Sequence, residues 1–243
     1  MARWRGSVLT YDNTKTVKGE ELGYGSFIFM GSPAKESGYN ACASSSAGCR
    51  EVCIYYAGMG VFPNVQKARI RKTIMYFTKR REFLELVNKD IKSAIRWSKK
   101  NHLTPCFRLD GTTDLGIARY FVNEYSDIQF YDYTKVIPRL KKASKFANWH
   151  TTYSLSEDTT NEQMNILLTG NSNIAVPFRN VPEPGRRVLG RRIASGDETD
   201  LRFLDGRNKI ITLKVKGRGR KSTNEFIVNN ADELAKRFAA AAC

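Results

Sequence analysis

The sequence lacks the features by which several common classes of protein are recognised. It has no phosphate-binding Gly-Lys-Ser loop, no dinucleotide-binding glycine fingerprint, no Gly-x-Ser-x-Gly elbow and no His-Glu-x-x-His motif. Their absence excludes the common nucleotide-binding, hydrolase and metalloprotease types. No segment approaches the ~18 apolar residues of a transmembrane helix, so we expect no membrane partner. The N-terminal residues contain no apolar core of a secretory signal, which favours a cytoplasmic protein.

Acidic residues are few relative to basic ones. The 243-residue chain has 40 Lys and Arg against 24 Asp and Glu, which gives a formal net charge of +16. A surplus of this size attracts phosphate-bearing molecules and favours their binding by counterion release. We therefore expect a nucleic acid or a nucleotide as partner; the alternative is a charge that serves only solubility. Because 41% of the residues are hydrophobic, the chain can bury a substantial core.

Cysteine is also scarce, but three of the five cysteines are clustered. Cys42, Cys49 and Cys53 lie close together, whereas Cys243 ends an Ala-rich tail and is interpreted as a bystander. An odd number argues against a closed disulfide framework. Clustered thiolates in a chain of intracellular character typically hold a metal or an iron–sulfur cluster. We expect a [4Fe–4S] cluster, with zinc as the alternative; the other interpretation is three ordinary thiols, two of them paired.

The spacing of these cysteines suggests how they would meet. Cys49 and Cys53 are one helical turn apart, which predicts that both sulfurs lie on one helix face, and Cys42 would reach them from the preceding loop. Three protein ligands leave one coordination position open, as a catalytic metal requires. The candidates for a fourth ligand, between which the sequence does not decide, are Cys106, Asp110 and His150.

Apolar runs alternate with helical patterns along most of the chain. Residues 1–22 are polar and mixed and are predicted to be an irregular lead-in, and residues 23–243 one α/β domain. Residues 64–100 show a helical period broken near 80–82. The predicted strands lie near residues 23–30, 105–109, 128–133, 149–155, 174–178 and 210–215. The predicted shorter helices lie near residues 116–124, 138–143, 162–168 and 232–241, and residues 180–209 are expected to be a long excursion.

Strands and helices repeated at this spacing are typical of parallel βαβ units. We predict a partial or open (β/α) barrel with parallel strands and the cysteine-bearing loop after the first strand. A doubly wound sheet is the alternative.

Polar residues follow several of the predicted strands. Because functional groups gather at the carboxyl ends of parallel strands, we expect these residues to line one pocket beside the cysteines. The candidate catalytic residues are Asp110, Asp114, Asp132, Lys135 and Ser154. Taken singly, Asp110 and Asp114 also fit a turn residue and a helix N-cap.

Two basic segments are candidates for contact with nucleic acid. One lies on the first long helix, and the other is the glycine-interleaved run KVKGRGRK, which has the composition of a phosphate clamp. The residues concerned are Arg69, Arg71, Lys72, Lys214, Lys216, Arg218 and Arg220. A solvated helix face would look similar. The acidic segment 195–206 matches no calcium loop and is interpreted as a turn.

Several of these segments, in this order, resemble the bacteriophage family catalogued as gene product 88. They are the cysteine segment with AGMGVFPNVQKARIRKT after it, then RLDGTTDL, YDYTK, TYSLSE and GDETDLRFLDGRNKIITLKVKG. The resemblance covers roughly residues 22–218. It implies a phage-encoded protein that works in the cytoplasm of the infected host, and it supplies no catalytic assignment.

A second resemblance is to radical S-adenosylmethionine enzymes, which hold a [4Fe–4S] cluster by three cysteines after the first strand of a partial barrel. It implies that Cys42, Cys49 and Cys53 are the cluster ligands and that S-adenosylmethionine is a second cofactor. Six and three residues separate the cysteines here, instead of three and two, and no Gly-Gly-Glu follows the second strand. These departures affect S-adenosylmethionine more than the cluster. The analogy is one of fold only.

Our first hypothesis is an iron–sulfur enzyme, with radical S-adenosylmethionine-like, redox or Lewis-acid chemistry, that acts on nucleic acid or nucleotides. The second is a non-catalytic nucleic-acid-binding protein with a structural metal. A zinc-dependent deaminase ranks last, because the His-x-Glu and Cys-x-x-Cys pair that it needs is missing.

Overall fold

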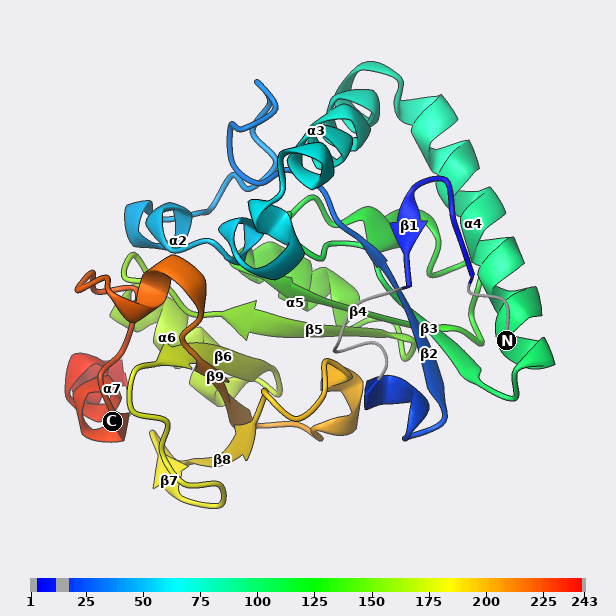
Figure 1. Ribbon diagram of the computed structural model, residues 1–243. Coiled ribbons are helices and arrows are strands. Elements are labelled where there is room, and N and C mark those ends of the chain that lie inside the picture. The colour runs from blue at the N-terminus through cyan, green and yellow to red at the C-terminus, as the bar shows by residue number, and fades with distance from the viewer. Residues whose placement is uncertain (1–3, 12–17, 242–243) are drawn as a thin grey trace.

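The computed structural model describes residues 4–11 and 18–241. Within them, nine strands form one sheet in the order β1-β2-β3-β4-β5-β6-β9-β8-β7 (Figure 1). The strands are β1 (Leu9–Thr10), β2 (Tyr24–Phe29), β3 (Thr104–Arg108), β4 (Gln129–Thr134), β5 (Trp149–Ser154), β6 (Asn173–Phe178), β7 (Arg187–Val188), β8 (Arg191–Ser195) and β9 (Lys209–Lys214).

The sheet is mostly parallel and open. Neighbouring strands from β2 to β6, and then β9 and β8, run parallel, whereas β1 and β7 pair antiparallel at the two edges. The two edge strands are not neighbours in the strand order, so the sheet is not closed into a barrel. The predicted α/β class, the six predicted strands and their parallel arrangement are confirmed, whereas the predicted barrel is not, because the described strands form an open sheet.

The lead-in is less irregular than predicted. It contains β1, so the cysteine segment follows the second strand of the sheet, β2. The carboxylate of Asp90 accepts hydrogen bonds from the backbone N–H groups of Ser7, Val8 and Leu9 at 2.7–2.9 Å, and this tertiary contact orders the segment. Residues 1–3 and 12–17 of the lead-in, and the predicted bystander Cys243, lie outside the described residues.

The predicted excursion at 180–209 contains the strands β7 and β8. The sequence of β8, RRIAS, looks polar, but its Arg191 is buried. The Arg191 guanidinium donates to the carbonyl groups of Leu168 and Gly170 at 3.1 and 2.9 Å, and also to those of Leu167 and Ser172. The arginine therefore satisfies the carbonyl end of a helix and can be buried in a strand.

The helices are α2 (Ala47–Glu51), α3 (Pro63–Thr78), α4 (Arg80–Lys100), α5 (Ile137–Ala143), α6 (Asn161–Thr169) and α7 (Ala231–Arg237). The predicted break between the two long helices falls at Lys79. The helix predicted at 116–124 is only a 3-10 turn, η3 (Ile117–Tyr120), preceded by Gly116 in the left-handed conformation. No helix among the described residues is long and apolar enough to span a membrane.

Two apolar clusters join the helices to one face of the sheet. In the first, α3 and α4 contribute Tyr76, Phe83 and Ile91, which pack with Phe27 and Phe107 of the strands. In the second, α6 and α7 pack against β5, β6 and β9. Alternate residues of each strand point to opposite faces of the sheet. The remaining strand residues therefore lie on the face away from these helices, which we call the inner face; the helix-covered face is the outer face.

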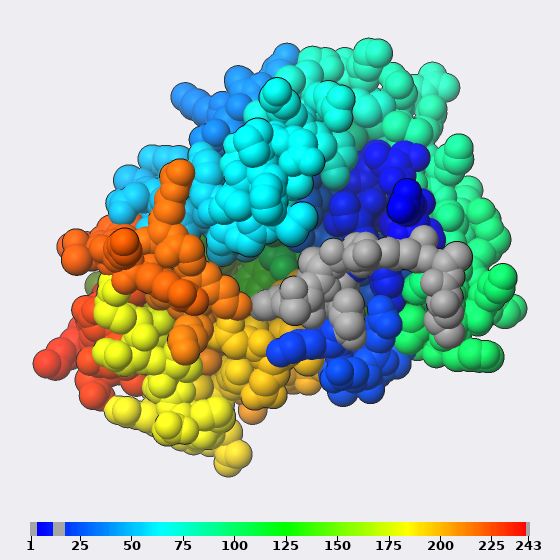
Figure 2. Space-filling model, in the orientation of Figure 1, coloured from blue at the N-terminus to red at the C-terminus, as the bar shows by residue number. Residues whose placement is uncertain are grey.

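The inner face is covered in part by the connection between β8 and β9, which includes η4 (Arg202–Leu204). Leu201 packs there on Cys106 and Tyr131, and Arg202 is buried. The acidic segment 195–206 is therefore a plug over the inner face rather than a simple surface turn. Above this plug the molecule is hollowed between the cyan and orange segments (Figure 2).

Candidate functional site at the carboxyl edge of the sheet

The loop after β3 is built around the carboxylate of Asp110. Its Oδ1 accepts hydrogen bonds from the Thr113 hydroxyl at 2.7 Å and from the Leu115 N–H at 2.8 Å. Its Oδ2 accepts from the N–H groups of Gly116 and Ile117 at 2.7 and 3.0 Å. Both oxygens are occupied by donors of the loop itself. Asp110 therefore holds the loop, as a turn and cap residue does, and is poorly placed to act as a base or a metal ligand.

Asp132 supports the same loop from the outer face of the sheet. Its carboxyl group accepts from the backbone N–H of Asp110 at 2.9 Å and from the Trp149 indole at 3.3 Å. Burial, and then the neighbouring Asp110, raise the pKa of Asp132 well above its usual value. The pocket that holds the cysteines is not lined by Asp132 but by the next residue, Tyr133, because successive strand residues point to opposite faces.

Asp114 and Lys135 connect the ends of β3, β4 and β5. Asp114 forms an ion pair with Arg139 and accepts a hydrogen bond from the Lys135 backbone N–H at 3.0 Å. The Lys135 ammonium donates to the hydroxyl and carbonyl oxygens of Ser154 at 2.9 and 3.0 Å and to the Leu155 carbonyl at 3.2 Å. Burial lowers the pKa of Lys135, and the adjacent Cys49 opposes this shift. Asp114, Lys135 and Ser154 all line the cysteine pocket.

The segment that carries the cysteines is anchored by Glu157, a residue that follows β5. The Glu157 carboxylate accepts from the Ser46 hydroxyl at 2.6 Å and from the Gly48 N–H at 2.5 Å. Ser46 in turn caps α2 by accepting from the Cys49 N–H at 3.2 Å. Glu157 was not among the predicted site residues. An isolated acid beyond a strand end gave no signal of its partner, which lies more than a hundred positions away.

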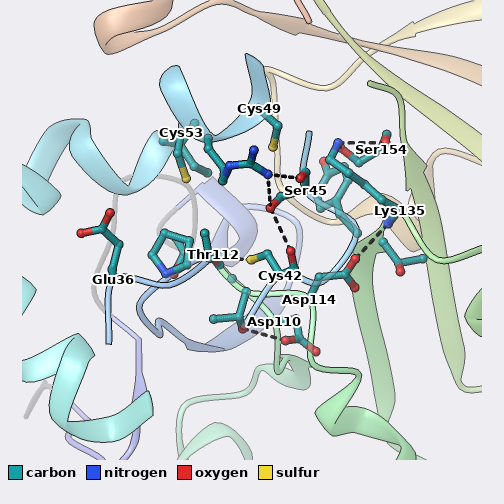
Figure 3. A pocket seen from close by; sticks show the side chains of 18 of the residues that line it. Glu36, Cys42, Ser45, Cys49, Cys53, Asp110, Thr112, Asp114, Lys135 and Ser154 are labelled. Atoms are coloured by element: carbon teal, nitrogen blue, oxygen red, sulfur yellow. Dashed lines mark hydrogen bonds between the residues drawn. The ribbon is translucent and has the colours of Figure 1, made fainter. Parts of the chain in front are cut away.

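The three clustered cysteines line one pocket of about 200 Å³. Figure 3 shows the sulfurs of Cys42, Cys49 and Cys53 directed toward the same space, above the Asp110 loop. Burial raises the pKa of Cys42 to about 12 and that of Cys53 to about 11, and it also raises that of Cys49. All three thiols are free and only partly exposed. For each thiol the effect of burial exceeds that of the neighbouring cations, among them Lys135 beside Cys49, and a raised pKa makes a thiol less suited to act alone as a nucleophile.

The helical arrangement predicted for Cys49 and Cys53 is only partly right. Helix α2 ends at Glu51, and Cys53 is the residue that precedes the next 3-10 turn, η1 (Ile54–Tyr56). The two side chains nevertheless line the same pocket. Within the described ranges, no three His, Cys, Asp or Glu side chains are grouped closely enough to hold a single metal ion.

The residues considered as a fourth ligand lie in different places. Cys106 is buried beneath the plug with Tyr131, and it does not line the cysteine pocket. His150 lines a separate groove beside α5 and α6. Asp110 lines the pocket, but its oxygens already accept four hydrogen bonds. None of these three candidates therefore offers a free ligand atom to the cysteine pocket, which contains three thiols.

The basic residues of α3 are largely engaged within the protein. The Arg69 guanidinium donates to the Tyr55 carbonyl at 3.3 Å and lies over the Tyr55 ring. Lys72 donates to the Val8 carbonyl at 3.0 Å, whereas Arg71 is exposed. The second set is exposed throughout and lies on β9 and the turn η5 (Gly217–Arg220). The members of this set are Lys214, Lys216, Arg218 and Arg220.

A comparison with models of known protein families identifies the family of this chain. The model of the family described as Gene product 88 matches residues 7–230. The chain belongs to the gene product 88 family. The predicted resemblance to this bacteriophage family is thus confirmed. Comparison with curated proteins and with solved structures gives no match, and the resemblance to radical S-adenosylmethionine enzymes receives no support from it.

In this member of the gene product 88 family, the site combines soft ligands with a fixed cation. Three thiols, a half-buried ammonium and the hydroxyl of Ser154 surround the pocket, while Asp110 and Glu157 hold the loops that form its walls. Sulfur ligands suit zinc and iron, and the ammonium suits an anionic or electron-rich group beside them. Within the described ranges these side chains are not grouped around one point, and the arrangement consists of three thiols beside a fixed ammonium.

Proposed function

We propose that this protein is an iron–sulfur enzyme in which Cys42, Cys49 and Cys53 hold a [4Fe–4S] cluster. The observation that carries the proposal is the convergence of three free thiols on one pocket at the carboxyl edge of a parallel sheet. We place its activity in the cytoplasm of the infected host, on nucleic acid or nucleotides, as its charge and its family suggest.

The donor set fits this group. Buried, uncharged thiols lose their protons readily to a bound cation, because metal binding and deprotonation are coupled. The three thiols share a pocket but are not grouped around one point. A cluster, in which each cysteine binds a different iron, requires a less close grouping of the thiols than a single zinc ion, whose ligands all lie within ~2.3 Å.

Three cysteine ligands leave one iron of such a cluster without a protein ligand. The cluster would supply an electron or a Lewis-acidic iron at that position. Lys135, fixed by Ser154 and Leu155, would bind and orient an anionic group of the incoming molecule. S-adenosylmethionine is one molecule that would suit such an iron, as the resemblance to radical enzymes implies. Asp110, Asp114 and Asp132 act by holding the loops rather than by moving protons.

Purification without oxygen tests the proposal. We expect a coloured protein with about four iron and four sulfide per chain. The variant with Cys42, Cys49 and Cys53 all changed to Ser should be colourless, while the matched control Cys106→Ala, at a buried cysteine outside the pocket, should keep its iron. Wild-type protein that is colourless and contains zinc, or no metal at all, would refute the cluster.

The alternative function is a nucleic-acid-binding protein in which a metal only stiffens the loop. The exposure of Lys214, Lys216, Arg218 and Arg220 favours it. It predicts binding that weakens steeply with salt and that the triple cysteine variant retains. It also predicts that no small molecule perturbs the spectrum of the metal centre.

A further inference from the structure

A second cavity, of about 420 Å³, opens beside the cysteine pocket. The two cavities share Cys49, Cys53, Arg108, Tyr133 and Ser154 as a common wall. Figure 2 shows the hollow in which it lies, bordered by cyan, orange and gold segments. Its volume falls within the range of pockets that bind small molecules, about 300–1,000 Å³. A ligand bound there would lie directly against the cysteine pocket.

Much of the cavity wall is apolar. Residues of β2 and β9, the residues directly after these two strands, the C-cap of α2 and one residue after η5 form this wall. The residues concerned are Ile28, Met30, Val52, Leu213, Val215 and Phe226. A flat, weakly polar group would lose water against this surface and gain contact with it.

Arg108 supplies a polar contact at the junction of the two cavities. It is 9% exposed, and it forms an ion pair with Asp200 at 2.6 Å and donates to the Gly111 carbonyl at 3.2 Å. Its guanidinium lies 4.7 Å from the centre of the Tyr133 ring, and its Nε has no hydrogen-bond partner among the described residues. The Nε itself is buried, but Arg108 lines both cavities, so an oxygen or ring nitrogen of a ligand that meets its side chain lies beside a positive charge largely removed from water.

The opposite rim is basic. Lys214 and Lys216 line the cavity and are exposed; Lys216 forms an ion pair with Asp197 at 3.0 Å. Just beyond them, the Arg218 guanidinium lies 4.0 Å from the centre of the Tyr56 ring. Exposed cations next to an aromatic ring are typical of sites that contact the phosphates and bases of a single strand. The cavity thus joins an apolar wall and a buried donor to a phosphate-attracting rim.

We propose that this cavity binds one nucleotide, with the base against the apolar wall and Arg108, and the phosphate at Lys214 and Lys216. The ligand is a free nucleotide or a single nucleotide of a strand, since both carry the same chemistry. A purely apolar ligand would make no use of the basic rim at Lys214 and Lys216, and a duplex is too large for a cavity of about 420 Å³. This nucleotide site specifies the ligand class of the proposed enzyme, and it rests on the proposed function only for the role of the cysteine pocket.

Two variants test the site in the full-length protein. Val215→Trp places an indole in the space that the base would occupy, and we expect it to weaken the binding of a fluorescent single-stranded oligonucleotide about tenfold or more, because the base is then excluded from the cavity. The double variant Lys214→Ala, Lys216→Ala should lower the slope of log Kd against log salt by about 1.4, the value for two phosphate contacts on a single strand. The matched control, Lys142→Ala with Lys145→Ala, removes the same charge from exposed positions near α5 and should change the slope little.

Competition then identifies the source of the ligand. Displacement of the oligonucleotide by a mixture of nucleoside monophosphates supports a free nucleotide, and displacement only by an unlabelled strand supports a nucleotide within a strand. Unchanged affinity of a folded Val215→Trp variant, or equal slopes for the two lysine pairs, would overturn the proposal. Iron is measured in the same samples, so that a protein without iron refutes the cluster, whereas an iron-bearing protein with these negative binding results refutes only the nucleotide site.

Discussion

Replacing Asp110 by Asn keeps the shape of this buried side chain but changes what it offers to the loop. The carboxylate now accepts four hydrogen bonds, two at each oxygen. In Asp110→Asn one oxygen becomes an amide nitrogen, so two buried donors face another donor. Each buried donor left unsatisfied costs ~1–3 kcal/mol, so we expect a loss of about 4 kcal/mol in the free energy of unfolding.

Thermal and denaturant unfolding measure this loss. For a chain of this size, 1 kcal/mol shifts Tm by roughly 2–4 °C, so the variant should melt about 8–16 °C below the wild type. Asp127→Asn is the matched control, because Asp127 is exposed and should change stability by less than about 0.5 kcal/mol. If Asp110→Asn melts within about 3 °C of the wild type, the carboxylate does not hold the loop. A role in the chemistry of the pocket would then be the better explanation.

Three further substitutions have defined outcomes. Glu157→Gln should lower the free energy of unfolding by ~1–3 kcal/mol, because one amide hydrogen faces the donor of Ser46 or Gly48, and unchanged stability would contradict the anchor. Under the proposed function it should also reduce the iron content of protein purified without oxygen. Burial, and then a nearby arginine, lower the pKa of Lys72 to about 8 from 10.5. Between these two pH values the unfolded chain therefore binds more protons than the folded protein. As pH rises from about 8 to 10.5, the free energy of unfolding of the wild type should increase by up to about 3 kcal/mol relative to that of Lys72→Met. If the free energies of unfolding of the two proteins change in parallel with pH, this prediction is wrong. Phe107→Ala, at a fully buried ring, should cost ~3–5 kcal/mol in denaturant unfolding, and a cost below about 1 kcal/mol would contradict the assigned core.

The strands that could be predicted from the sequence are those whose apolar residues form continuous runs. The apolar residues before Arg108 and before Thr134 predicted β3 and β4. Both strands are buried against helices on one side, which is why their sequences are rich in apolar residues. Strand β8 could not be predicted, since its Arg191 looks like a surface residue until the carbonyl groups of α6 are brought next to it. The same holds for β1, which depends on the distant carboxylate of Asp90.

The candidate site was predictable in position but not in the division of roles. Asp132 and Tyr133 are adjacent in the sequence, yet only Tyr133 faces the pocket, because the exact register of a strand decides which neighbour points inward. Asp110 does line the pocket, but its oxygens serve the loop. Arg108, at the end of a short apolar run, gave no sign that it lies between two cavities.

The contacts of the cysteine segment also predict how the protein behaves without a metal. Helix α2 is held by hydrogen bonds of Glu157 and Ser46. The Cys42 thiol lies 3.9 Å from the Thr112 carbonyl oxygen. All of these contacts are made within the protein and do not require a bound metal. The loop should therefore be formed before a cluster binds. We expect the variant with all three clustered cysteines changed to Ser to have a Tm within about 5 °C of metal-free wild type, since Ser keeps the size of Cys and can donate the same hydrogen bonds at these half-buried positions. A collapse of the fold in this variant, measured by circular dichroism, would mean that the thiols stabilise the loop themselves, and that the site is not preformed.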